Sequence, residues 1–426
     1  MKKMLIFISI LVTMSAQATT ISELFDALKK QPTSKLDQIN EQMANTAIKK
    51  VESNYYPKVD LFASYTHYNS ATNLLPLDPI AAGKLIGQGK ALPFAQTIER
   101  YGIKVSIPVF VKELSALSKK AEYMTKGARL KKRLNFYKNE AVILGANSGL
   151  EYIYHLEQTL KATKKSIEKT KSDMQVAVDN GRMPGIAIDK IDEKLNQLEI
   201  AINNVNIKKV SLLSKIESLT GVTLKNFTPM SLISKVNTNN IFALKPLQQI
   251  INASQSDLKA SKAKRYYPKI GANIFWSENY SSNAVNTDSS VHRGYGYYQL
   301  GFSLPLYDKT SDADIQLKQI ALMKDKMKLE KTKTELKSEA NSLNQELNLL
   351  KKSEKLTQEN IVKKEDLLKF AKVATKEGRM SEEDYLRYED GLMSAKSNYY
   401  QIKSQIWQNI AKLAVIYGND LRSIVK

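Results

Sequence analysis

The sequence predicts an α+β membrane protein built from a duplicated unit, in which two strands are followed by a long helical hairpin. Three observations predict this fold class. Apolar and polar residues alternate in short segments, two stretches without proline are far longer than ordinary globular helices, and the same order of signals occurs in both halves of the chain. Neither the strands nor the helices of one chain can bury all their apolar surface, so we expect the protein to be an oligomer.

The first 18 residues have the three regions of a cleaved signal peptide. Two lysines precede the apolar stretch Met4–Met14, and the sequence Ala-Gln-Ala then ends at residue 18. The apolar stretch is too short to span a bilayer as a helix, which favours cleavage over anchoring. We therefore expect residues 1–18 to be removed and the mature chain to be exported.

The composition argues against most kinds of enzyme. The 426 residues include no cysteine, which excludes disulfides, thiolate metal sites and cysteine catalysis. The three histidines, His67, His155 and His292, are far apart in the sequence. The chain contains no nucleophile elbow, phosphate-binding loop or zinc motif. We expect no catalytic residues, no metal site and no cofactor.

The formal net charge of +21, or +19 without the two lysines of the signal peptide, has two interpretations. A basic protein can bind a polyanion, such as nucleic acid or the phosphates of lipopolysaccharide. Alternatively, the lysines solvate long helices. The second interpretation is favoured, because the lysines are widely spread and no nucleic-acid-binding motif accompanies them. We expect no nucleic-acid partner.

An internal duplication divides the mature chain into a first repeat, 19–230, and a second repeat, 231–426. The matching segments are Tyr55–Lys58 with Tyr266–Lys269, Tyr101–Phe110 with Tyr298–Tyr307, Gly181-Arg182-Met183 with Gly378-Arg379-Met380, and Gly221 with Gly418. The last three pairs are 197 residues apart and the first pair is 211 apart. One 14-residue excess in the first repeat explains the difference.

Each repeat begins with a helix that ends at a Tyr-Tyr-Pro sequence, since proline disfavours helix at the residue before it. Two strands follow, expected at 59–68 and 98–109 in the first repeat and at 270–280 and 294–306 in the second. The loops between them, 69–97 and about 281–293, differ greatly in length.

The second strand of each repeat alternates strictly. Tyr101, Ile103, Val105 and Ile107 share one face, and Arg100, Gly102, Lys104 and Ser106 share the other. In the second repeat Tyr298, Leu300, Phe302 and Leu304 oppose Tyr297, Gln299, Gly301 and Ser303. This pattern is typical of a membrane β-barrel with lipid outside and water inside, and equally of a strand that faces the core of a soluble sandwich.

Helical hairpins are expected at 112–219 and 309–417. No proline occurs from Lys112 to Val178, and neither proline nor glycine from Lys309 to Thr375, so each stretch would extend about 100 Å as one helix. The returning helices carry a heptad-like stripe that predicts a coiled-coil seam. Its members are Leu195, Leu198, Ile202, Val205, Lys209, Leu212, Ile216 and Leu219, and then Leu392, Ala395, Tyr399, Ile402, Ile406, Asn409, Leu413 and Ile416.

This arrangement resembles the TolC-like outer membrane efflux proteins from about Ile21 to Leu421. The features that match are the helix into Tyr-Tyr-Pro-Lys, the strands ending in Ile-Pro-Val-Phe and Leu-Pro-Leu-Tyr, and the glycine-containing hairpin turns, each in two copies. The resemblance implies a homotrimer in the outer membrane of a Gram-negative bacterium. Three chains would form one 12-stranded β-barrel in outer membrane lipid, continued into the periplasm by a tunnel of twelve helices.

The resemblance also implies a function. The protein would be the passive duct of a tripartite efflux pump or a type I secretion system, and its partners would be a periplasmic adaptor protein and an inner-membrane transporter that supplies the energy. Within the barrel, Arg100 and Lys104 would face the lumen.

The hairpin turns would form the periplasmic tip at which the adaptor docks, through Gly181, Arg182, Met183, Gly378, Arg379 and Met380. A plainer interpretation is that the glycines only permit tight turns. Asp384 occupies the place of an acidic residue that lines the constriction in the family, whereas Arg387 stands at a second such position one helical turn later. Asp189 and Asp192 share one helical face near the first turn, and a solvated helix surface explains them equally well.

Two other functions remain open. The chain could be a periplasmic helical adaptor or scaffold, with its strands in a soluble subdomain, or a basic surface protein that binds lipopolysaccharide or another polyanion.

Overall fold

The computed structural model describes residues 20–426, apart from 91, 183 and 283–289; the expected signal peptide therefore lies outside the described residues. The chain forms two compact units. Unit 1 combines Met1–Asn40, Arg129–Lys245 and Glu330–Lys426, and unit 2 combines Glu41–Ala128 and Pro246–Leu329. Each unit contains segments of both expected repeats, so the repeats and the compact units are different divisions of the chain.

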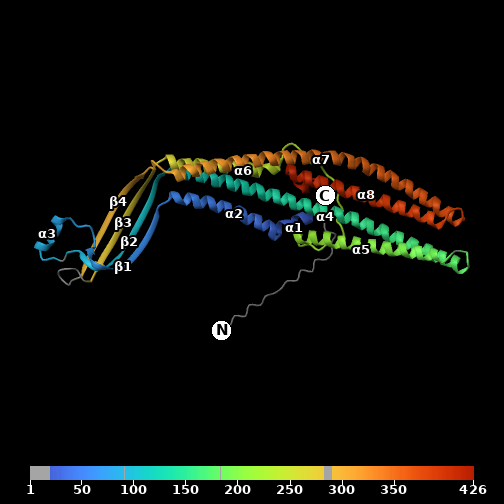
Figure 1. The fold of residues 1–426 in the computed structure, drawn as a ribbon, viewed down its shortest axis with the longest axis horizontal. Helices are drawn as coiled ribbons and strands as arrows, with labels where there is room; N and C mark the ends of the chain where they lie inside the picture. The colour runs from blue at the N-terminus through green and yellow to red at the C-terminus, as the bar shows by residue number, and fades with distance from the viewer. Residues whose placement is uncertain (1–19, 91, 183, 283–289) are drawn as a thin grey trace, which may run out of the picture. The chain divides into compact units, whose positions relative to one another are not determined.

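Both halves of the chain contain the same order of elements: a helix, two strands and a helical hairpin (Figure 1). In the first half these elements are α2 (Pro32–Glu52), β1 (Lys58–Asn73), β2 (Phe94–Val111), α4 (Lys112–Asp179) and α5 (Ile186–Thr220). In the second half they are α6 (Lys245–Tyr266), β3 (Lys269–Ser281), β4 (Val291–Ser303), α7 (Lys309–Lys376) and α8 (Glu382–Tyr417). Helices α4 and α7 are each 68 residues long. Among the described helices, none is long and apolar enough to cross a lipid bilayer.

Several boundaries differ from the expected ones for local reasons. The loop expected at 69–97 contains a helix, α3 (Pro79–Gly87). Asp78 caps this helix, because its Oδ1 accepts the N–H of Ala81 at 2.8 Å and Pro79 stands in the first turn, where no donor is needed. The last strand was expected to continue to 306 but ends at Ser303, two residues before Pro305, which has no N–H to donate to a ladder.

Unit 2 contains one antiparallel sheet with the strand order β1-β2-β3-β4 (Figure 1). Lys58 lies opposite Ser106 at the start of β1, and Lys269 lies opposite Ser303 at the start of β3. The first strand of each pair therefore begins at the Lys of the Tyr-Tyr-Pro-Lys sequence, directly after the proline that ends the preceding helix. In the described part of the chain, β1 pairs only with β2 and β4 only with β3, so both are edge strands.

The main core of unit 1 is formed around a short N-terminal helix, α1 (Ile21–Lys30). Thr20 and Glu23 form a capping box, which satisfies the first free N–H groups of this helix. Its four large apolar side chains are fully buried against residues of α4, α5, α8 and the C-terminal segment. Members of this core include Ile21, Leu24, Phe25, Leu28, Ile143, Leu144, Leu150, Ile216, Trp407 and Leu421.

The heptad stripes of α5 and α8 lie in the helix packing of unit 1, and their polar members have specific partners. Lys209 Nζ donates to Glu157 Oε2 of α4 at 3.1 Å. Asn409 Nδ2 donates to Glu346 Oε2 of α7 at 3.2 Å. A polar residue in a seam costs stability unless it is paired, and each of these pairs fixes one axial level between two helices.

Candidate functional site

One face of the sheet in unit 2 is apolar and exposed. In the ladder, Ile103 lies opposite Trp276 and Val105 lies opposite Ile274, which itself lies opposite Tyr298. Residues directly opposite each other point to the same side, so the alternating faces of β2 and β4 join across all four strands. The exposed side chains of this apolar face are Val59, Leu61, Tyr65, Tyr101, Ile103, Ile274, Trp276, Tyr298, Leu300 and Phe302. Tyr298 is 90% exposed and Leu61 is 81% exposed, which marks a surface made for contact with lipid or with another chain.

Arg100 and Lys104 lie together on the opposite, polar face of the sheet. Arg100 Nε donates to Asn279 Oδ1 at 3.1 Å, and its Nη2 donates to the carbonyl of Asn73 at 3.3 Å. Lys104 is exposed and lies opposite Asp60 in β1. The two cations therefore differ: Arg100 is held by neighbouring strands, whereas the ammonium group of Lys104 is open to solvent.

A row of aromatic rings crosses the polar face, which sequence alternation did not predict. The Phe62 and Phe275 rings stack at 5.4 Å, and Phe275 stacks on Tyr297 at 5.2 Å. Phe62 and Phe275 come from β1 and β3, with β2 between them, and Phe62 lies opposite Gly102 of β2. Because Gly102 has no side chain, the rings of the flanking strands can meet above it. A glycine inside an otherwise regular strand was the available sequence signal.

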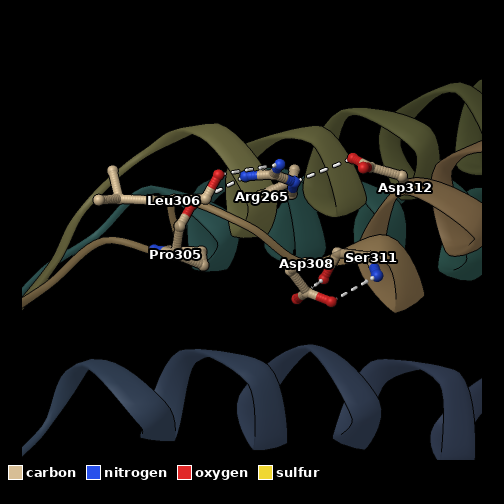
Figure 2. Close-up of polar contacts among 6 residues, drawn as sticks. All are labelled: Arg265, Pro305, Leu306, Asp308, Ser311 and Asp312. Atoms are coloured by element: carbon tan, nitrogen blue, oxygen red, sulfur yellow. Dashed lines mark hydrogen bonds and ion pairs between the residues drawn. The ribbon is translucent and has the colours of Figure 1, made fainter.

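The connection between the sheet and the helices of the second half is held by Arg265, at the end of α6. Figure 2 shows its guanidinium group between α7 and the segment that precedes it. The group donates to Asp312 Oδ1 at 2.9 Å and to the carbonyl of Pro305 at 2.8 Å. Asp308 caps the start of α7, since Oδ1 accepts the N–H of Ser311 at 3.0 Å. The hydrogen bonds from Ser311 lower the pKa of Asp308, which keeps this cap ionised.

The hairpin turns that connect α4 to α5 and α7 to α8 depend on glycine. Gly181 has φ +67° and Gly378 has φ +69°, in the left-handed region that disfavours other residues. Arg182 and Arg379 are exposed, and Arg379 Nε lies 3.3 Å from Glu377 Oε2. Met380 is half-buried, whereas Met183 lies outside the described residues. The backbone conformation alone accounts for the glycines, and the two arginines are exposed cationic side chains of these turns.

The charged residues expected near the turns do not form one cluster in the described chain. Asp384 lies in the first turn of α8, where its Oδ2 accepts the Ser381 hydroxyl at 2.7 Å and its Oδ1 lies 3.4 Å from Arg387 Nη1. Asp192 of α5 instead pairs with Lys171 of α4. Asp189 is exposed on α5.

The most buried acid near the turns, Glu389, was missed in the sequence. It is 8% exposed, and its Oε1 accepts hydrogen bonds from the Ser166 hydroxyl of α4 and from the Tyr385 hydroxyl at 3.0 Å. Burial raises the pKa of Glu389, although the two hydrogen bonds act to lower it. The next residue, Asp390, accepts Lys194 Nζ of α5 at 2.7 Å. Extending the alternating spacing of the α8 stripe back from Leu392 reaches Tyr388, so the stripe gave no signal for Glu389.

No protein-family model matches the sequence, and no curated protein matches it. Solved structures do match, at low sequence identity. The CmeC outer membrane channel of Campylobacter jejuni is 14% identical with a TM-score of 0.78, over 94% of this chain and 85% of that one. The outer membrane protein VceC of Vibrio cholerae is 12% identical with a TM-score of 0.75, over 93% and 96%.

The MtrE outer membrane channel of Neisseria gonorrhoeae is 13% identical with a TM-score of 0.73, over 95% of this chain and 90% of that one. In each case the likeness extends over nearly the whole chain. These likenesses confirm the fold predicted from the sequence, in which one chain contributes four antiparallel strands and long helices.

Proposed function

We propose that this chain is one third of a trimeric TolC-like channel in the outer membrane of a Gram-negative bacterium. It would be the passive duct of a tripartite efflux pump or a type I secretion system. The observation that carries the proposal is the sheet, which has an exposed apolar face and two edge strands. The fold likeness to CmeC, VceC and MtrE supports it, because each of these is described as an outer membrane channel or protein.

The sheet is incomplete in a single chain. An edge strand presents a row of unpaired N–H and C=O groups, and in hydrocarbon each unpaired group costs several kcal/mol. Four strands are too few to close a barrel, and eight is about the minimum seen in the outer membrane. Pairing of β4 in one copy with β1 in the next removes every edge when three copies form a ring of twelve strands. The apolar face then meets lipid, and the face with Arg100 and Lys104 lines the lumen.

The helices continue this duct into the periplasm. Helix α4 begins at Lys112, directly after β2 ends at Val111, so the path leads from strand to helix without a loop. Three copies of four helical segments would surround a water-filled path whose selectivity depends on its width and lining charge. The duct needs no catalytic residue and no cofactor, because the energy comes from an inner-membrane transporter.

The hairpin turns are the proposed docking sites for a periplasmic adaptor protein. Arg182 and Arg379 are exposed there and offer cationic groups to an acidic partner surface. The neighbouring acids Asp384, Asp189 and Asp192, with Arg387, are the proposed lining of the gate. Replacing Arg182 and Arg379 together with glutamate would then abolish adaptor binding in a pull-down while leaving the trimer intact.

The decisive experiment extracts the protein from membranes and determines its mass and shape by light scattering and negative-stain microscopy. The proposal expects a protein that only detergent releases, and a trimeric cylinder clearly longer than about 100 Å, the length of one 68-residue helix. A monomer, or release by salt or carbonate, would refute the channel and favour a periplasmic adaptor or scaffold. Salt-sensitive binding of a polyanion by a monomer would identify a basic surface protein instead.

A further inference from the structure

A basic groove lies within unit 2, where the first turns of α4 face the last turns of α6. Its volume is about 660 Å³, within the range of ligand sites. Four lysines line it, two from each helix, together with the two tyrosines that precede β3: Lys112, Lys119, Lys259, Lys262, Tyr266 and Tyr267. No aspartate or glutamate is among the lining residues. The groove therefore concentrates positive charge without an internal counter-charge.

The lysines of the groove have no acidic partner, unlike three other lysines of unit 2. Lys120 and Lys318 both pair with Asp257, at 2.8 Å and 2.9 Å, and Lys269 pairs with Glu113 at 3.1 Å. In contrast, none of the four groove lysines forms an ion pair with any described residue. Four unpaired ammonium groups around one groove repel each other, and an anionic ligand would relieve that repulsion.

The position of the groove indicates which anion this is. Lys112 directly follows β2, and Tyr267 is two residues before β3, so the groove lies where the sheet meets the helices. The Lys269–Glu113 pair lies on the polar side of the sheet, since Lys269 and Asn273 share a face and Asn273 accepts the Ser106 hydroxyl. Glu113 and Lys120 lie on a different face of α4 from Lys112 and Lys119. The groove lysines of α4 are therefore about a quarter turn of the helix away from the residues that pair on the polar side.

We propose that this groove binds the phosphate headgroup of an anionic phospholipid whose acyl chains lie along the apolar face of the sheet. This inference rests on the proposed function, because it requires the sheet to be in a bilayer. Lysine ammonium groups bind phosphate as point charges, and tyrosine places its ring in the apolar layer and its hydroxyl at the headgroup level. Tyr266 and Tyr267 are 61% and 47% exposed, as this role requires.

The test compares two triple variants of the full chain. The groove variant is Lys119→Gln/Lys259→Gln/Lys262→Gln. The control is Lys324→Gln/Lys326→Gln/Lys328→Gln, which removes the same charge from exposed lysines of α7 in the same unit. Delipidated trimers in detergent are titrated with phosphatidylglycerol and with phosphatidylcholine, and bound lipids are counted by native mass spectrometry. Each lysine near an anionic headgroup strengthens binding about fivefold. In the groove variant, the preference for phosphatidylglycerol over phosphatidylcholine should therefore fall about tenfold or more.

The control triple should keep the wild-type preference. Equal binding of the two lipids by the wild type, or an equal loss in both variants, overturns the proposal. Displacement of phosphatidylglycerol by inorganic phosphate at constant ionic strength also overturns it, since that result identifies a free-phosphate site.

A separate measurement tells failure of this inference from failure of the proposed function. Trp276 is 51% exposed on the apolar face, whereas Trp407 is 6% exposed in the core of unit 1. In vesicles of brominated phosphatidylcholine, the Trp276 fluorescence of wild type and both variants should be quenched, with Trp407 as constant background. No quenching refutes insertion of the sheet and therefore the channel. Quenching without a lipid preference refutes only the groove.

Discussion

Glu140→Gln is expected to remove a pH-dependent loss of stability from unit 1. The Glu140 side chain is on α4, has no exposed surface, and accepts the N–H of Leu421 with Oε2 at 3.4 Å. Its other oxygen has no hydrogen-bond partner among the described residues. The nearby charged groups are Asp420 and Arg422 of the C-terminal segment, and Arg422 itself pairs with Asp26 of α1.

Burial raises the pKa of Glu140 from 4.5 to about 8, and the negative charge of Asp420 adds to the effect, while the Leu421 N–H and Arg422 oppose it. At 1.36 kcal/mol per pH unit, this change corresponds to about 5 kcal/mol of unfolding free energy. That figure is an upper limit, because water and the Arg422 side chain can approach the carboxylate once it ionises.

The raised pKa of Glu140 in the folded state decides the direction in which stability changes with pH. Folded protein binds this proton more tightly than unfolded protein, so the contribution to stability is complete below pH 4.5 and is lost as the pH rises through about 8. The wild type should therefore melt at a lower temperature near pH 9 than near pH 6. Glutamine cannot ionise, so the melting curve of Glu140→Gln should lack this decrease. Fluorescence of Trp407, which lies in the same core, reports the transition.

Glu157→Gln is the matched control, since Glu157 is also a buried acid of α4. The hydrogen bond from Lys161 lowers the pKa of Glu157, against the effect of burial, and Lys209 also lowers it. Its contribution to stability is thus present above the unfolded pKa and is lost in acid. Glu157→Gln should destabilise the protein at neutral pH, where Glu140→Gln should not. Equal pH dependence of melting in wild type and Glu140→Gln would refute the reasoning.

Three further changes test the fold by thermal melting of the extracted protein. Arg265→Ala removes charge-assisted hydrogen bonds from a largely buried side chain and should cost about 2 to 3 kcal/mol, whereas Arg265→Lys should recover only part of this. Gly418→Ala should destabilise the protein, because the φ of Gly418 is +72° and the new Cβ would overlap the Phe242 ring. Its control is Gly391→Ala inside α8, which should leave the stability unchanged or raise it by up to about 1 kcal/mol. Gly102→Val should prevent folding of the sheet, since its Cβ would overlap the backbone of β3; a normally assembled trimer would contradict the register.

Periodicity in the sequence predicted the four strands, the long helices and the apolar faces of β2 and β4. Strict alternation around Tyr101 and Tyr298 predicted one apolar face, and the ladder joins the two segments into one surface. The glycines of the matching segments predicted the ends of the helices. Gly181, Gly378 and Gly418 all have positive φ, as does Gly221. These features depend on residues close together in the sequence, so a single sequence contains the information.

Pairings between distant elements could not be predicted in the same way. Glu140 continues an apolar stripe of α4 with Tyr137 and Leu144, which marks it as a buried acid, but only the fold places Leu421 beside it. Nothing in the sequence connects Ser166 with Glu389 across 223 residues. The order of helices around a bundle decides such contacts, and that order is a property of the tertiary fold.

The two halves show which features a repeated pattern preserves. Arg265 joins α6 to the start of α7. The corresponding residue of the first half is Asn54, which makes a local contact instead: its Nδ2 donates to the carbonyl of Lys50 at 3.0 Å. Likewise Asp192 and Glu389 occupy corresponding positions, yet one pairs with a lysine and the other is buried against hydroxyl groups. Backbone turns and apolar periodicity are thus shared, whereas the polar contacts are particular to each half. Under the proposed function, identical halves could build the duct, so the side chains that differ at the junction and near the turns are the ones to test for gating and partner binding.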